Sequence, residues 1–138
     1  LRNQWPVSMD ETDHRRRSIY LFARRNLRYP IFELFDRPDL AESCAARKVS
    51  TTAPQSLGLL NSEFTRAAAK RLAKHVISEA HTPRKQLTLC YKLLLGRTPD
   101  ANELTAATEL FSGQDTQQKG LSDLCLALFN LNEFLYLD

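Results

Sequence analysis

This sequence lacks the features of several large protein classes. No apolar run approaches the roughly 20 residues that a membrane-spanning helix needs, and the longest apolar tract, residues 121–137, is interrupted by serine, acids and asparagines. Residues 1–13 are polar and contain no apolar h-region, so they do not form a signal peptide. Internal repeats and low-complexity segments are also absent. The chain is therefore predicted to be globular.

Cysteine is scarce. The three cysteines, Cys44, Cys90 and Cys125, lie far apart and form no CxxC or CxxCH motif. A structural zinc site and a covalent c-type haem are therefore not expected within this chain, and we predict no cofactor for it. An odd number of cysteines argues against a disulfide framework and allows at most one bridge. We expect buried free thiols that pack as small apolar groups.

The composition fits one ordinary domain. The chain has 138 residues, of which 43% are apolar and 25% charged, with a net charge of +3. Residues 1–48 hold ten Lys/Arg against seven Asp/Glu, whereas residues 49–138 hold nine of each. A stretch without acids carries Arg15, Arg16, Arg17, Arg24, Arg25 and Arg28. These arginines either form a patch for an anionic partner or pair with Glu33, Asp36, Asp39 and Glu42 downstream, which we favour.

Apolar periodicity and capping residues predict a mostly helical chain. Residues 19–22 are apolar and are interpreted as a strand or an extended segment, and Pro30 opens a short helix over 30–35. Another short helix is predicted over 40–48. The remaining helices are predicted over residues 54–60, 63–79, 83–95, 99–112 and 116–131. Thr52, Thr82 and Thr98 are the expected N-caps of three of them.

These elements predict an all-α antiparallel helical bundle over residues 54–138. Residues 1–53 form an irregular, Arg-rich segment in the same single domain, with one short strand or hairpin as an alternative. Helix 83–95, apolar around most of its circumference, is expected at the centre, and Gly96 is expected to end it at positive φ. The expected core is Phe64, Leu72, Val76, Leu87, Tyr91, Leu94, Leu104, Phe111, Leu124 and Leu128, with Phe64, Ala68, Leu72 and Val76 as a buried stripe.

Seven short phrases along the chain together carry a family resemblance. They are residues 16–20 (RRSIY), 35–39 (FDRPD), 44–48 (CAARK), 51–57 (TTAPQSL), 59–62 (LLNS), 95–99 (LGRTP) and 131–138 (LNEFLYLD). In this order they resemble the planctomycete cytochrome-c-associated C-terminal domain, a domain of unknown function. The resemblance runs from about His14 to Asp138. Lys48 departs from it, because arginine is more usual at that position.

The resemblance implies a context for the chain. Such domains end long proteins that carry a secretion signal, often a c-type cytochrome module, and a companion domain of unknown function. It therefore implies an extracytoplasmic location, a companion domain as partner, and c-type haem elsewhere in the full-length protein. It names no reaction.

Three groups of residues are weighed as chemical sites. Cys44 lies near Arg47 and Lys48, which lower a thiol pKa, but no histidine follows closely as a base, so a structural thiol is favoured. The carboxylates Glu33, Asp36, Asp39 and Glu42 suit a cation or acid–base pair less well than salt bridges, because Pro38 interrupts their spacing. The histidines His14, His75 and His81 are scattered, and surface positions are the ordinary case.

The predicted binding residues lie around the start of helix 54–60. Arg47, Lys48, Thr51, Thr52, Gln55 and Asn61 are expected to converge on the positive end of this helix, and Arg24, Arg25 and Arg28 to add charge. The alternative is that the hydroxyl and amide groups only cap backbone N–H groups.

The sequence thus favours a non-catalytic interaction or structural module of a secreted multidomain protein. It would dock a companion domain or hold an anionic or polymeric ligand such as a polysaccharide. The alternative is that the chain contributes part of an active site shared with the companion domain, for polysaccharide or redox chemistry. Nucleic acid is the least favoured partner, because the charge is too small for phosphate binding.

Overall fold

The computed structural model describes residues 8–10, 12–13, 16–20, 30–35 and 53–136. The chain divides into two compact units, Leu1–Lys48 and Val49–Asp138. Over the described ranges the chain forms helices and no strand, so the predicted all-α fold is confirmed there. None of these helices is long and apolar enough to cross a membrane. The single-domain assignment, with its division at residues 53 and 54, stays a prediction.

The described residues of the first unit include the 3₁₀ turn η2 and the short helix α1. The 3₁₀ turn η2 spans Ser18–Tyr20 and the helix α1 spans Pro30–Leu34. The strand prediction is therefore wrong for Ile19 and Tyr20, because the Tyr20 N–H bonds back to the Arg17 carbonyl at 3.0 Å. Both side chains are exposed, so η2 buries no apolar face. The helix at Pro30 is confirmed; the fixed φ of proline suits a first helical turn.

One arginine of the basic stretch pairs with an acid that precedes it. The Arg16 Nε lies 2.9 Å from the Asp13 Oδ1. The predicted pairing of the arginines with the downstream acids stays a prediction, because Asp36, Asp39, Glu42 and the side chain of Glu33 lie outside the described residues. The other arginines paired in that prediction lie outside the described residues, except for Arg17, which is exposed.

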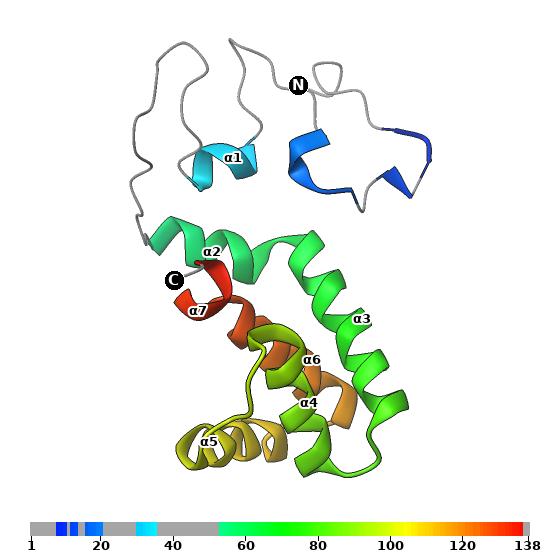
Figure 1. The fold of residues 1–138 in the computed structure, drawn as a ribbon, viewed down its shortest axis with the longest axis vertical. Coiled ribbons are helices and arrows are strands. Elements are labelled where there is room, and N and C mark those ends of the chain that lie inside the picture. Colours follow the sequence, from blue (N-terminus) through cyan, green and yellow to red (C-terminus); the bar gives the residue numbers. More distant parts are fainter. Residues whose placement is uncertain (1–7, 11, 14–15, 21–29, 36–52, 137–138) are drawn as a thin grey trace. The chain divides into compact units, whose positions relative to one another are not determined.

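The second unit is built from six helices over residues 53–136, coloured green to red in Figure 1. They are α2 (Ala53–Asn61), α3 (Glu63–Glu79), α4 (Pro83–Leu95), α5 (Ala101–Ser112), α6 (Gln117–Phe129) and α7 (Asn132–Leu135). Their bounds follow local signals. Pro83 occupies the first turn of α4, Gly96 ends it at φ 73°, and the Thr116 hydroxyl accepts a bond from the Lys119 N–H at the start of α6.

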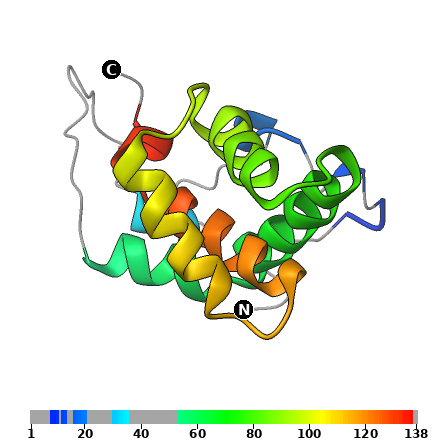
Figure 2. The ribbon, with the colours of Figure 1, turned by 90° about the horizontal axis from the view of Figure 1, so that it is seen from below.

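Helix α6 lies at the centre of the second unit. It contacts α2, α3, α4, α5 and α7, and its packing along α3 is the most extensive. Figure 2 shows α6, in orange, next to α5, in yellow. The prediction of a central α4 is therefore wrong. Leu93 of α4 is 48% exposed, whereas Leu121 and Cys125 of α6 are fully buried, so the apolar circumference of α4 is not covered on every side.

The buried stripe of α3 is shifted by one residue from the prediction. Thr65, Ala69, Ala73 and Val76 are buried, whereas Phe64 is 63% exposed. A prediction from the largest apolar residues misplaces the stripe. The small residues Ala69 and Ala73 face α6 instead, because they let the two helices approach closely. Of the predicted core, Val76, Leu87, Tyr91, Leu124 and Leu128 are buried, Leu72, Leu94, Leu104 and Phe111 are half-buried against it, and Phe64 is the error.

Candidate functional site

Most of the predicted binding residues lie outside the described residues. These are Arg24, Arg25, Arg28, Arg47, Lys48, Thr51 and Thr52. Cys44, His14 and the acids Asp36, Asp39 and Glu42 also lie outside them, as does the side chain of Glu33. Gln55 and Asn61 are described, and they are the part of the predicted site whose geometry can be stated.

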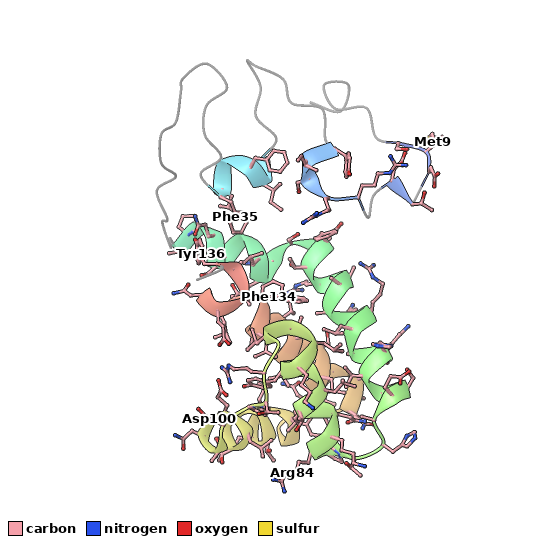
Figure 3. All side chains as sticks on the ribbon, viewed as in Figure 1. Met9, Phe35, Arg84, Asp100, Phe134 and Tyr136 are labelled. Carbon is pink, nitrogen blue, oxygen red and sulfur yellow. The ribbon has the colours of Figure 1, made fainter. Side chains whose placement is uncertain are left out.

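Gln55 is a buried polar residue in the first turn of α2. Its side chain is 2% exposed, and its Oε1 lies 3.5 Å from the Tyr136 hydroxyl. Figure 3 shows Tyr136 beside the beginning of α2. Residues from the two ends of the second unit therefore meet here, at the long limit of a hydrogen bond.

Asn61 does not join Gln55. It is the last residue of α2, and its exposed side-chain amide donates to the Leu57 carbonyl at 2.9 Å. Six residues of helix separate the two amides, which is about 9 Å along the axis. The predicted convergence of Asn61 on the start of α2 is therefore wrong, because its amide closes the C-terminal turn of that helix.

A denser polar cluster surrounds Arg97, just after Gly96. The Arg97 Nη1 and Nη2 each lie 2.7 Å from an oxygen of Glu103, and its Nε and Nη2 lie 2.7 and 2.8 Å from the two oxygens of Glu133. Nη1 also donates to the Thr98 carbonyl at 3.3 Å. These bonds engage all the N–H groups of the guanidinium. Its Cζ lies 5.8 Å from the centre of the Tyr91 ring, within cation–π range.

Helix α5 begins inside this cluster. The Asp100 Oδ1 accepts from the Glu103 N–H, and a Glu103 carboxylate oxygen accepts from the Asp100 N–H, both at 2.8 Å. This reciprocal pair is a capping box. The predicted N-cap at Thr98 is therefore wrong. Asp100 provides the cap because only there does a glutamate follow at the third helical position.

The electrostatics of the cluster follow from these bonds. The Arg97 guanidinium, together with the Asp100 N–H, holds the pKa of Glu103 at about 2. Arg97 also lowers the pKa of Glu133, and the two carboxylates raise the pKa of Arg97. The pKa of Tyr91 lies above its usual value, chiefly because burial disfavours the phenolate. The cluster therefore stays charged over the ordinary pH range.

The sequence does not identify this cluster as a set of interacting residues. The phrases 95–99 and 131–138 contain Arg97 and Glu133, but nothing in the sequence links these two residues, which lie 36 positions apart. The one signal for it in the sequence is the spacing of Asp100 and Glu103, which fits a capping box. Since the arginine has no N–H group left for a ligand, the cluster joins the α4–α5 connection, α5 and α7 and acts as a structural joint.

A basic surface remains exposed on α3 and at the start of α4. We give this name to the side chains of Lys70, Arg71, Lys74, Arg84 and Lys85, all of them exposed. Within the described part of the chain, none of the five forms a salt bridge. Figure 3 shows Arg84 pointing away from the helices. Arg66 and Lys92 are exposed as well, and the Arg66 Nε donates to the Leu60 carbonyl at 3.1 Å.

Charge is divided along the second unit. Residues 63–95 hold seven Lys/Arg against two Asp/Glu, a balance of +5, and residues 96–138 hold two against seven, a balance of −5. Several of these acids have structural roles: Glu103 and Glu133 pair with Arg97, Asp100 caps α5, and Asp115 lies 3.4 Å from Lys119. The basic surface is therefore not neutralised by the acids that follow it in the sequence.

The remaining described candidates form no metal-binding group. His75 and His81 are exposed. Cys90 and Cys125 are buried free thiols, as predicted. Among the described residues, no three His, Cys, Asp or Glu side chains come together as a metal-binding group. The exposed basic surface is thus the candidate site of the second unit.

Comparison with known protein families identifies the family of this chain. A family model described as PSD1, protein of unknown function (DUF1553), matches residues 2–111. The chain belongs to the PSD1 family. The matched range covers both units as far as α5 and includes the basic surface and Arg97, whereas α6 and α7 lie beyond it. Neither the curated proteins nor the solved structures contain a match.

Proposed function

We propose that this chain is a non-catalytic interaction module that holds an anionic partner through its basic surface. The observation that carries the proposal is the exposure of Lys70, Arg71 and Lys74 on α3, and of Arg84 and Lys85 on α4, without salt bridges among the described residues. Five exposed cations close together in the sequence produce a positive potential that attracts anions and raises their local concentration.

The spacing on α3 suits an extended anionic partner. Lys70 and Lys74 are four residues apart, so they lie on one side of the helix about 6 Å apart along its axis. Arg71 lies beside them and supplies a fork of donors for a carboxylate or sulfate, whereas a lysine supplies a point charge. The surface then holds the partner by several weak contacts and not by one deep site.

The partner that we propose is a companion domain of the same polypeptide, or an anionic polymer such as an acidic polysaccharide. The Arg-rich segment, with Arg24, Arg25, Arg28, Arg47 and Lys48, remains a separate predicted binding region, and these five residues lie outside the described residues. In this proposal the full-length protein is extracytoplasmic and of the planctomycete, cytochrome-c-associated type. A c-type haem, if present, belongs to another part of that protein and not to this chain. These statements rest on the sequence resemblance.

A charge-removal variant tests the proposal. The triple variant Lys70→Ala, Arg71→Ala, Lys74→Ala keeps α3 helical, because alanine is the best helix former. Titration calorimetry with heparin as the polyanion is expected to show at least tenfold weaker binding, and the affinity of the natural chain should fall as salt screens the surface. Lys119→Ala is the control, since that cation pairs with Asp115.

The same variants distinguish the two partners. In the full-length protein, release of the companion domain by the triple variant supports docking, whereas loss of heparin binding alone supports the polymer. Equal affinity of the triple variant and the natural chain for both probes rejects the basic surface as a binding site. A reaction that needs this chain and the companion domain together rejects the non-catalytic assignment in favour of a shared active site.

A further inference from the structure

Two buried cysteines face each other in the core of the second unit. Cys90 of α4 and Cys125 of α6 are both fully buried, and their Sγ atoms are 3.9 Å apart. They lie 35 residues apart in the sequence, with all of α5 between them. Fully buried residues such as Leu87 and Leu121 belong to the same core cluster. Two thiols are thus held together from two different helices.

We propose that Cys90 and Cys125 are a disulfide site, at which an oxidant of the disulfide class links α4 to α6. The structure contains the reduced form, with both thiols free. The Sγ atoms need to approach each other by about 1.9 Å, from 3.9 Å to the roughly 2.04 Å of an S–S bond. The inference is independent of the proposed binding function.

The reaction is ordinary thiol–disulfide exchange. The thiolate of one cysteine attacks one sulfur of the oxidant, forms a mixed disulfide, and expels the other sulfur as a thiolate that takes up a proton. The thiolate of the other cysteine then attacks the protein sulfur of the mixed disulfide and expels the second half of the oxidant. In total, the two protein thiols lose two protons and two electrons, and the oxidant disulfide is reduced to two thiols.

The contact between the two thiols couples their titration in the folded chain. The pKa of Cys90 lies below its usual value because the Cys125 thiol stabilises the Cys90 thiolate by a hydrogen bond, and burial only partly opposes this. The pKa of Cys125 is raised by the same bond and by burial. The two opposite shifts describe one pair that shares a hydrogen bond in which either Sγ can be the donor, so the first proton is lost by the pair.

Burial determines when the bond forms. An oxidant cannot reach a fully buried thiol, so exchange occurs while the chain folds or when α4 transiently separates from α6. Native packing then brings the second thiol to the mixed disulfide. The bond closes a long loop and so restricts the unfolded chain, which stabilises the folded state.

The experiment uses the full chain carrying Cys44→Ser, so that only Cys90 and Cys125 can pair. The reduced, unfolded protein is refolded in a buffer of oxidised and reduced glutathione and digested without reduction. We expect a Cys90–Cys125 cross-linked peptide, no thiols titratable in denaturant, and a Tm higher by on the order of 10 °C that dithiothreitol reverses. Peptide mapping of the natural chain, with all three cysteines, provides the same readout without any substitution.

Single variants provide the controls. Cys90→Ala and Cys125→Ala leave one partner, so neither should form the cross-linked peptide or show the reversible rise in Tm. Three results overturn the proposal: two free thiols in the refolded monomer, cross-links between chains only, or a bonded monomer that has lost helical content. The last result would mean that α4 and α6 cannot accommodate the bond.

Discussion

At the scale of single residues, Arg97 joins three parts of the second unit. Its guanidinium bonds Glu103 at the start of α5 and Glu133 in α7, and it also contacts the Tyr91 ring in α4. Paired N–H···O bonds of this kind fix geometry as well as charge, because the planar fork matches a carboxylate. The position of α7, a helix of only four residues, therefore depends on a side chain that belongs to the α4–α5 connection.

The Arg97 joint makes stability depend on pH. The pKa of Glu103 is about 2 in the folded chain and 4.5 in the absence of the fold. Its contribution to stability is therefore complete above pH 4.5 and is lost as the pH falls towards 2. We expect the Tm of the natural chain to fall over this range and that of Glu103→Gln to fall less.

A double-substitution cycle checks the assignment to this pair. Arg97→Lys keeps the charge but lacks the fork, so the Tm at pH 7 should fall by several degrees. Combining it with Glu103→Gln should cost less than the sum of the two single effects, because both remove the same contact. Additive effects would mean that the pair is not coupled.

Gly96 is a position where backbone conformation determines the residue. Its φ is 73°, and a Cβ placed there would meet no atom within 4 Å, so any cost of a side chain comes from the backbone alone. We expect Gly96→Ala to lower the free energy of unfolding by about 1 kcal/mol, and Gly96→Asn by less, since asparagine tolerates this region better.

Gly113 provides the matched control for Gly96. Its φ is −79°, and its added Cβ would make only ordinary contacts, the nearest at 3.7 Å. Gly113→Ala should therefore cost nothing or stabilise slightly, because it restricts the unfolded chain. Chemical denaturation of the three variants measures both effects. Equal losses at Gly96 and Gly113 would contradict the left-handed assignment.

At the scale of elements, the sequence predicted where helices lie better than which face each one buries. Pro83, Gly96 and Thr116 act through local backbone chemistry, so they mark helix ends without knowledge of the tertiary structure. The inner face of α3 depends on its neighbour. Ala69 and Ala73 are fully buried because α6 packs closely there, and no pattern within α3 favours them over Phe64.

Exposure along α4 allows a test of the core. Leu87 is 1% exposed and Leu93 is 48% exposed, on the same helix. We expect Leu87→Ala to cost about 2–5 kcal/mol and Leu93→Ala less than about 1 kcal/mol. Leu94→Ala should fall between them, since Leu94 is half-buried against the core. Denaturation midpoints compare the three directly, and a larger loss at Leu93 would reverse the orientation of α4.

At the scale of the whole molecule, the candidate site was less predictable than the fold. The equal numbers of acids and bases in residues 49–138 hid a division into a basic part and an acidic part. Pairing decides which of these charges remain available, and pairs such as Arg97–Glu133 join residues far apart in the sequence. A net charge near zero therefore did not indicate the basic surface on α3 and α4.

The second unit should fold without the first. Its buried apolar residues all lie between Leu59 and Phe129, and the Arg97 joint and the cysteine pair lie within the same unit. A chain of residues 49–138 therefore contains the contacts among the described residues of this core. We expect a fragment of these residues to show helical circular dichroism and one cooperative unfolding transition. Leu87→Ala should lower the stability of the fragment and of the full chain by the same amount, because the lost contacts are identical. A fragment that is helical but unfolds without cooperativity would show that residues 1–48 complete the core.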